Sequence, residues 1–291
     1  MDIQKILRGK QEQFETYIAD LPRMESGTLR DAMAYSYLAQ GKRLRPSLFL
    51  LAAETFGADS QDLLPFAAGI EMIHTYSLIH DDLPAMDNDD YRRGKPTCHK
   101  IFGDGMAVLA GDGLLTEAFQ MMISIRDIVE PARLLGALEM AASHSGIQGM
   151  VYGQSLDIEG EGKPLTLEEL KTIHYYKTGA LLSFSMASGA LLAGAKEDEV
   201  KAMDFYGRKF GLAFQITDDI LDATGSFETL GKPIGSDQKS HKTTYVTLLG
   251  IEGARSEARK AMKEAKVSIS KISRDLAVFH SLGKYVIERD R

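Results

Sequence analysis

The sequence is poor in the residues that cross-link or interrupt a fold. Cys98 is the only cysteine among 291 residues, which excludes an internal disulfide and is typical of a reducing cytoplasm. There are only 8 prolines, and no stretch alternates apolar and polar residues over the length of a strand. The composition therefore predicts a mostly helical, cytoplasmic protein.

The chain also lacks an excess of positive charge, because its 34 Lys and Arg residues are outnumbered by 41 Asp and Glu residues. The net charge of −7 makes the overall field of the protein unfavourable for nucleic acid or an anionic membrane surface. Residues 1–5 carry no apolar signal core, and the most apolar stretch, 179–195, is short and rich in Ser and Gly, as a buried helix is. We expect no nucleic-acid partner and no membrane span.

Apolar residues recur at helical spacing along most of the chain, and no linker separates regions of different composition. We therefore predict one all-α domain over residues 1–291. The clearest helix start is a capping box at Thr166 and Glu169, and the main polar break covers 87–104. The other expected helices lie near residues 3–20, 28–39, 46–57, 61–82, 105–125, 131–150, 166–194, 197–223 and 241–249, with two more before the C-terminus.

Two aspartate-rich segments interrupt strongly apolar stretches far apart in the chain. The first, DDLPAMD, covers residues 81–87, and the second, DDILD, covers residues 218–222. Uncompensated carboxylates are costly beside apolar residues, and clustered carboxylates repel one another. The two segments therefore predict bound cations, and carboxylate ligands suit Mg²⁺ better than zinc.

Helical spacing decides which side chains of the second segment act together. Gln215, Asp218 and Asp222 share one face of a helix, whereas Asp219 is rotated away from Asp218. This face predicts a cation site on the second helix.

The first segment follows the same logic up to a break. His74, Ser77 or Leu78, and Asp81 form one stripe of the earlier helix, but Pro84 cannot continue regular helical hydrogen bonding. Asp87 would lie on a different face of an unbroken helix. A loop at residues 83–84 would bring it back beside Asp81.

Positively charged residues accompany the acidic segments. The motif GKRLRP, residues 41–46, leads into a helix whose N-terminus, with Lys42 and Arg45, is a natural diphosphate site. Arg92 and Arg93 directly follow the first acidic segment. The remaining candidate cations are Lys177, Lys232 and Lys242.

An ordered set of motifs resembles the trans-isoprenyl diphosphate synthase family, closest to its bacterial branch. The resemblance implies a bundle of antiparallel helices around a deep central pocket, a homodimer and several Mg²⁺ ions per active site. It also implies a prenyltransferase that condenses isopentenyl diphosphate with dimethylallyl and geranyl diphosphates to give farnesyl diphosphate. The motifs are GKRLRP (41–46), DDLPAMD (81–87), RRGKPT (92–97), KTG (177–179), QITDDILD (215–222) and GKPIGSD (231–237).

The resemblance further implies a role for each candidate residue. The implied metal ligands are Asp81, Asp82, Asp87, Asp218 and Asp222, with Asp82 and Asp222 near the ions or bound through water. The implied holders of the allylic diphosphate are Arg92, Lys177 and Lys232. The implied holders of isopentenyl diphosphate are Lys42, Arg45, His74 and Arg93, with Lys242 near the diphosphates. The residues that would face the developing cation are Thr178 and Gln215.

The length of the product depends on where the pocket ends. Ser77 and Tyr76 lie four and five residues before Asp81, about 6 to 7.5 Å along the helix axis. A bulky Tyr76 would form a floor there, and the resemblance supports this position as a length gauge. We expect a fifteen-carbon product.

Several other activities share part of this pattern. A synthase of geranylgeranyl or geranyl diphosphate would use the same site with a different pocket depth. A class I terpene cyclase uses the same metal-assisted ionisation but needs no second diphosphate site. A phosphohydrolase forms no carbon–carbon bond, and a non-catalytic subunit of a heteromeric synthase does not require both acidic segments.

Overall fold

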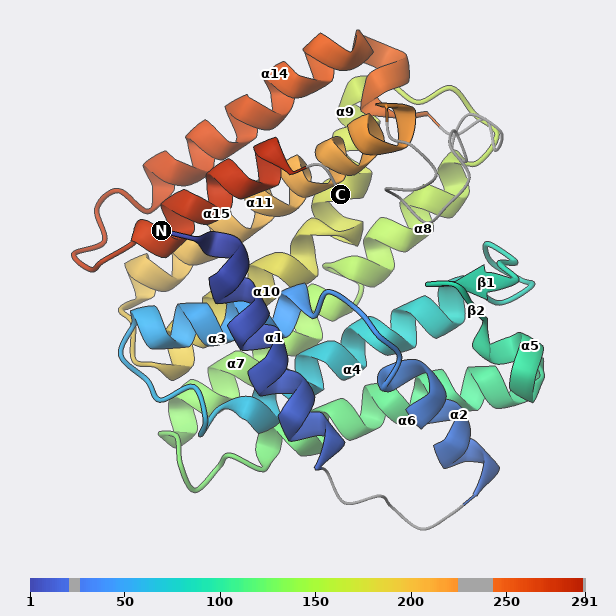
Figure 1. Ribbon diagram of the computed structural model, residues 1–291, viewed down its shortest axis with the longest axis horizontal. Coiled ribbons are helices and arrows are strands. Elements are labelled where there is room, and N and C mark those ends of the chain that lie inside the picture. The colour runs from blue at the N-terminus through green and yellow to red at the C-terminus, as the bar shows by residue number, and fades with distance from the viewer. Residues whose placement is uncertain (21–26, 225–242, 290–291) are drawn as a thin grey trace.

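The chain folds into a bundle of helices with one very short β-hairpin (Figure 1). The computed structural model describes residues 1–20, 27–224 and 243–289. The all-α architecture expected from the helical spacing is confirmed. In chain order the described elements are α1 (Ile3–Ala19), α2 (Thr28–Tyr37), α3 (Leu44–Thr55), α4 (Leu64–Asp81), β1 (Tyr91–Arg92), β2 (Lys95–Pro96), α5 (Cys98–Phe102), α6 (Asp104–Ile123), α7 (Pro131–Ser145), α8 (Met150–Gly160), α9 (Leu167–Lys177), α10 (Gly179–Leu192), α11 (Glu197–Thr224), α14 (Tyr245–Ser268) and α15 (Ala277–Glu288).

Helices α3 and α10 form the middle of the bundle, because both are apolar on nearly every side and buried accordingly. Opposite faces of α3 serve two apolar clusters, with Phe49 in one and Leu48 in the other. The two helices approach so closely that a Cβ at Gly189 would stand 2.5 Å from the carbonyl oxygen of Phe49. Glycine is therefore required at this crossing.

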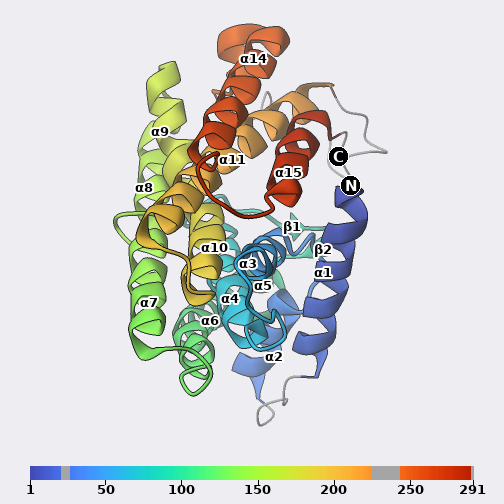
Figure 2. The same ribbon diagram turned by 90° about the vertical axis from the view of Figure 1, so that its left-hand side faces the viewer.

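Helices α4 and α6 pack antiparallel on one side of this centre (Figure 2). Near the end of α4, the Nε2 atom of His80 lies 3.0 Å from the carbonyl oxygen of Val108 at the start of α6. Near the start of α4, a Cβ at Gly69 would stand 2.7 Å from the carbonyl oxygen of Ala118. The acid-bearing end of α4 is thereby fixed next to the hairpin.

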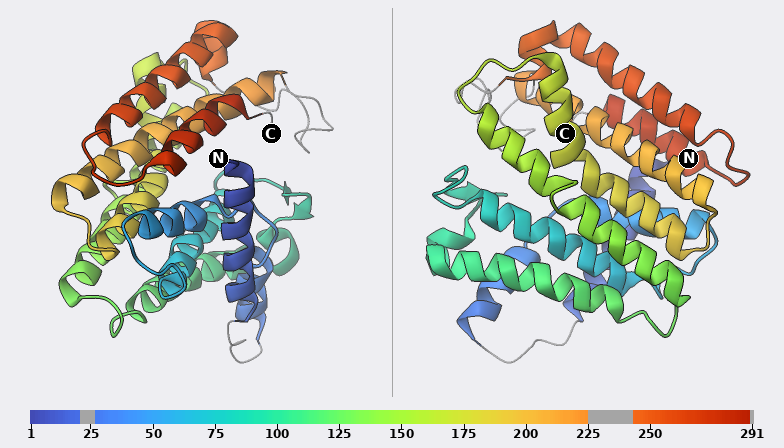
Figure 3. Two further views of the ribbon diagram at one scale, coloured as in Figure 1. Left: turned by 60° about the vertical axis from the view of Figure 1, so that its left-hand side comes forward. Right: turned by 180° about the vertical axis from the view of Figure 1, so that it is seen from behind.

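Helices α11, α14 and α15 cover the other side (Figure 3). Helix α11 runs antiparallel to α10, with Gly207 packed against the backbone of Ser183. The hydroxyl of Tyr206 donates to the carbonyl oxygen of Phe279 at 2.6 Å and so ties α15 to α11. This packing sets the orientation of the second acidic segment.

The largest departure from the expected helices is a break at Thr178. The sequence predicted one helix over 166–194, but it divides at Thr178 into α9 and α10. The capping box at Thr166 and Glu169 is confirmed. Periodicity alone does not reveal the division, because apolar residues continue on both sides of it.

Two smaller differences have local causes. The helix expected over 131–150 ends at Ser145, and α8 begins as a separate helix, which the sequence analysis missed. A Cβ at Gly149 would stand 2.0 Å from the carbonyl oxygen of His144, so the turn depends on glycine. The polar break over 87–104 contains the hairpin and the short helix α5.

Candidate active site

The first acidic segment folds back on itself at the end of α4. Asp81 is the last residue of this helix, and the N–H of Asp87 donates to its carbonyl oxygen at 2.8 Å. A second bond, from the N–H of Asn88 to the carbonyl oxygen of Leu83 at 3.1 Å, closes the same loop. The loop predicted around Pro84 is therefore present and returns the chain to Asp81.

The Asp81 carboxyl lies in a setting that disfavours its ionised form. Burial raises its pKa to about 6; the charge of Lys177 opposes this rise, and that of Asp87 adds to it. A buried carboxylate beside a second carboxylate favours a bound cation and is typical of functional sites.

Asp82 is engaged by the hairpin. Its buried carboxylate accepts from Nε of Arg92 at 2.6 Å, and the same oxygen lies 2.5 Å from Nη2 of that arginine. Because Arg92 belongs to β1, this pair fixes the hairpin to the end of α4. The pair uses Oδ1 of Asp82 with Nε and Nη2 of Arg92, so it does not engage Oδ2 of Asp82 or Nη1 of Arg92.

The second acidic segment lies on α11 with the predicted division of faces. Gln215, Asp218 and Asp222 follow one another on one face. Asp219 is buried on another, where its Oδ2 atom accepts from the N–H of Tyr245 at 2.9 Å. Asp219 thus holds the start of α14, and the Asp218 side chain is 41% exposed.

Arg289, close to the C-terminus, binds the second acidic segment. Its Nη2 atom donates to Oδ1 of Asp218 at 2.6 Å and to the carbonyl oxygen of Phe214 at 2.8 Å. The guanidinium carbon lies 3.8 Å from the centre of the Phe214 ring. The sequence analysis missed this residue because no motif surrounds it. A cation bound at Asp218 would have to share this carboxylate with Arg289 or displace the arginine.

The break between α9 and α10 joins the two acidic segments. Oγ1 of Thr178 donates to Oε1 of Gln215 at 3.2 Å, one helical turn before Asp218. Lys177, the preceding residue, lies close enough to Asp81 for its charge to lower that carboxyl's pKa. Two neighbouring residues at this break thus interact with two segments that are distant in sequence.

Helix α8 contributes polar residues that the sequence analysis did not assign. Oδ2 of Asp157 accepts from Nζ of Lys177 at 2.6 Å. One turn earlier, both amide atoms of Gln154 are buried without a hydrogen-bond partner among the described residues, which a ligand or water would satisfy. A Cβ at Gly153 would stand 2.1 Å from the backbone nitrogen of Lys177. The spacing of three residues between Gln154 and Asp157, which places both on one helix face, was the sequence signal that could have identified them.

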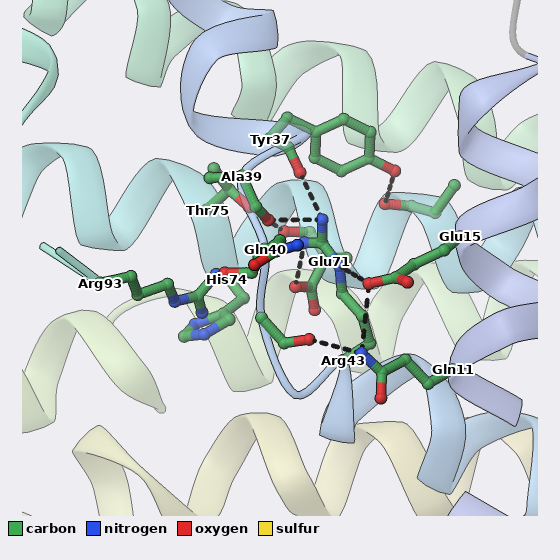
Figure 4. Close-up of polar contacts among 12 residues, drawn as sticks. Gln11, Glu15, Tyr37, Ala39, Gln40, Arg43, Glu71, His74, Thr75 and Arg93 are labelled. Atoms are coloured by element: carbon green, nitrogen blue, oxygen red, sulfur yellow. Dashed lines mark hydrogen bonds and ion pairs between the residues drawn. The ribbon is translucent and has the colours of Figure 1, made fainter. Parts of the chain in front are cut away.

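Positive charges gather at the start of α3 and at the hairpin (Figure 4). Burial and neighbouring guanidinium groups hold the pKa of His74 well below its usual range, so its imidazole is neutral. Burial lowers the pKa of Arg45 to about 10, and its Nε atom has no hydrogen-bond partner among the described residues. Such a group suits an anion. We call the arginines whose charges act on His74 the basic cluster: Arg43, Arg45, Arg92 and Arg93.

Of the remaining candidate lysines, the structure describes only Lys42. Lys42 is exposed between the last turn of α2 and α3. Lys232 and Lys242 lie outside the described residues.

Tyr76 and Ser77 lie on α4, just over one helical turn before the first acidic segment. Tyr76 is 7% exposed, and burial, with a smaller contribution from Asp81, raises its pKa to about 12. Its ring meets the His80 ring edge-on at 5.8 Å between centres. The hydroxyl of Ser77 donates to the carbonyl oxygen of His74 at 2.9 Å. The ring is bulky and buried, and its role as the floor of the pocket stays a prediction.

Known proteins of one family match this chain over nearly its whole length. The polyprenyl synthetase family model matches residues 26–277. Farnesyl diphosphate synthase of Geobacillus stearothermophilus is 46% identical over 100% of this chain and 99% of its own length. Geranylgeranyl pyrophosphate synthase of Capsicum annuum chloroplasts is 47% identical over 91% of this chain and 73% of its own.

A solved structure gives the same result. The apo crystal structure of an FPP/GFPP synthase from Zymomonas mobilis is 35% identical with a TM-score of 0.85, and the match covers 98% of this chain and 99% of that one. This chain belongs to the polyprenyl synthetase family.

Proposed function

We propose that this protein is a prenyltransferase that joins isopentenyl diphosphate head-to-tail to dimethylallyl and then geranyl diphosphate, giving farnesyl diphosphate. The observation that carries this proposal is that two separate groups of side chains each suit a diphosphate. One is the junction of the acidic segments with Lys177, and the other is the basic cluster with His74. An enzyme with a single diphosphate substrate needs only the first. We assign the activity to one domain spanning residues 1–291, in the cytoplasm, where the buried thiol of Cys98 stays reduced.

The first of these sites fits Mg²⁺. Asp81 and Asp87 on one wall and Asp218 on the other offer oxygen ligands, which Mg²⁺ prefers. Within the described ranges, no three His, Cys, Asp or Glu side chains converge to hold an ion alone. The ions would complete their shells with diphosphate oxygens and with waters held by Asp82 and Asp222. Bound Mg²⁺ would supply positive charge for the leaving diphosphate.

The side chains of the site fit the steps of such a reaction. Lys177 places a fixed positive charge on the departing diphosphate. Thr178 and Gln215 direct their oxygen dipoles at the allylic carbons as these become cationic. Arg45 and the neutral His74 hold the second substrate so that its double bond attacks at short range. The apolar helices exclude water, and the departed diphosphate takes the proton that is lost.

Incubation with isopentenyl and dimethylallyl diphosphates and Mg²⁺, followed by chromatography, tests this function. We expect a fifteen-carbon diphosphate. A ten- or twenty-carbon product would assign geranyl or geranylgeranyl diphosphate synthesis instead. Hydrocarbons from farnesyl diphosphate alone would indicate a terpene cyclase, and phosphate release without a new carbon–carbon bond a phosphohydrolase. Product formation only in the presence of a second protein would indicate that this chain is a subunit of a heteromeric synthase.

Mg²⁺ binding should weaken as the pH falls. The Asp81 carboxyl must lose its proton to bind a metal, and its metal-free pKa is about 6. Above pH 6 binding is independent of this proton, and below it the half-saturating Mg²⁺ concentration should rise about tenfold per pH unit. The rise in melting temperature of the substrate-free protein with Mg²⁺ measures this without diphosphate titration. A half-saturating concentration that stays constant from pH 7 to pH 5 would contradict it.

We propose that a second copy of this chain covers α6. Among the described helices, only α6 is long and apolar enough to cross a bilayer, and about a third of it is buried. Val108, Leu109 and Ile123 are exposed on it, with Leu109 at 52%. An apolar helix face of this kind marks an interaction site, and a homodimer accounts for it.

Leu109→Glu should therefore convert a dimer into a monomer of 32.0 kDa, because it places a charge in an apolar interface. Sedimentation equilibrium measures the mass. The matched control is Val267→Glu, at an exposed position of α14, which should leave the mass unchanged. A wild-type monomer, or a Leu109→Glu dimer as stable as the wild type, would contradict this surface.

A further inference from the structure

Three side chains hold the loop between α2 and α3, one from the loop itself and two from other parts of the chain. The carbonyl oxygens of residues 39–41 accept, in order, from Nη2 of Arg43 at 2.8 Å, Nη1 of Arg93 at 3.2 Å and Nε2 of Gln11 at 2.9 Å. Each of these three carbonyls thus depends on a different donor. The position of Lys42 and Arg45, which follow directly, depends on those bonds.

Arg43 is the centre of this arrangement (Figure 4). It has a left-handed backbone with φ of 45°, which is costly for a residue with a side chain and persists where the surroundings fix it. Its side chain is only 2% exposed and bonds Oε1 of Glu71 at 2.9 Å and the carbonyl oxygen of Tyr37 at 3.0 Å. The left-handed turn buries Arg43 between Lys42, which is exposed, and Arg45, which is half-buried.

Helix α1 reaches the same loop from the other side. Besides its bond to the loop, Gln11 donates to Oε1 of Glu15 at 3.2 Å, and that oxygen lies 3.7 Å from Nε of Arg43. In Figure 4 these α1 side chains lie on one side of Arg43, with His74 and Arg93 on the other. An effect of Gln11 on a substrate at His74 must therefore pass through the loop and Arg43.

We propose that Arg43, fixed by Glu71 and supported by Gln11 of α1, is a positioning residue that orients Lys42 and Arg45 toward the isopentenyl diphosphate. The inference rests on the proposed function, which places that substrate at the basic cluster. Glu71 neutralises the buried Arg43, so Arg43 acts by holding geometry and not by binding phosphate. Its planar guanidinium serves acceptors in several directions, which a lysine ammonium on a flexible stem does not reproduce.

A matched pair of substitutions on α1 tests the proposal. Gln11→Met removes the donor to the loop and keeps the size of the side chain. Gln13→Met removes a bond of the same kind, from Nε2 of Gln13 to Oγ of Ser60 at 3.0 Å, which ties α1 elsewhere. Loss of one such bond corresponds to about a threefold to tenfold change in an equilibrium constant. We expect Gln11→Met to raise KM for isopentenyl diphosphate by that factor.

The pattern of kinetic constants separates positioning from general destabilisation. KM for dimethylallyl diphosphate and kcat should stay within about twofold in Gln11→Met, and Gln13→Met should change neither KM despite a similar loss in melting temperature. Arg43→Lys should raise KM for isopentenyl diphosphate by more than Gln11→Met does. Equal changes in both methionine variants, or an unchanged KM for isopentenyl diphosphate in Gln11→Met, would overturn the inference. A wild-type enzyme that forms no product would instead refute the proposed function.

Discussion

Replacing Asp81 with asparagine should abolish most turnover while making the fold more stable. Asparagine keeps the shape of the side chain but removes the charge that would hold a divalent cation at the end of α4. Electrostatic groups that stabilise a leaving diphosphate contribute about 10²–10³ in rate each, and loss of a metal ligand removes more. We therefore expect kcat to fall by about 10³ or more, measured from product formation at saturating substrates.

The stability of this variant should change in the opposite direction. The Asp81 pKa is raised from 3.8 to about 6 by burial, so at pH 7 its ionised form destabilises the metal-free fold. Asparagine removes that cost, and the free energy of unfolding should rise by about 1–3 kcal/mol in metal-free buffer at pH 7. Well below pH 3.8 the carboxyl is protonated in both the folded and the unfolded state, and the gain should vanish. Chemical denaturation at the two pH values measures it.

Asp90→Asn provides the matched control. Asp90 lies in the same acidic stretch, but its side chain is 60% exposed and pairs with Nζ of Lys100 at 2.7 Å. Exposed pairs of this kind contribute little, so both kcat and stability should stay close to those of the wild type. A similar loss of turnover in both variants would show that net charge, and not the position of Asp81, decides activity.

Local rules predicted the backbone geometry of the two acidic segments better than their long-range contacts. The spacing of Gln215 and Asp218 placed them on one face, and Pro84 predicted the loop that returns Asp87 to Asp81, as the structure has it. These features depend on a few neighbouring residues. The division of the helix at Thr178 depends instead on packing against α11, which periodicity does not record.

Long-range pairings were beyond the sequence for the same reason. Arg289 binds Asp218 from a position 71 residues away, and Arg43 binds Glu71 from one 28 residues away. Arg43 stands within a motif whose other basic residues suggested a phosphate site, and only burial shows that it serves the loop. The charge of a side chain is read from sequence, whereas its partner is set by the fold.

Tyr76→Ala should lengthen the product. Overall identity does not fix product length, because a farnesyl and a geranylgeranyl synthase are 46% and 47% identical to this chain. The length must therefore depend on particular residues of the pocket. Tyr76 lies about 7.5 Å before Asp81 along α4, and its buried ring would stop a fifteen-carbon chain. Without the ring, we expect most of the product to carry twenty or more carbons, as measured by chromatography of the dephosphorylated alcohols.

Two further substitutions test whether product length depends on the hydroxyl of Tyr76 and on the position of the ring along α4. Tyr76→Phe keeps the ring and should keep the fifteen-carbon product, whereas Ser77→Phe brings a ring closer to Asp81 and should shorten the product. Loss of a buried ring costs about 3–5 kcal/mol, so the assay must run well below the melting temperature of Tyr76→Ala. A folded Tyr76→Ala enzyme with the wild-type product distribution would show that another wall ends the pocket. A longer product from Tyr76→Ala together with a shorter product from Ser77→Phe would place the end of the growing prenyl chain against α4. Instability alone would lower the yield of both variants and would not change their product lengths in opposite directions.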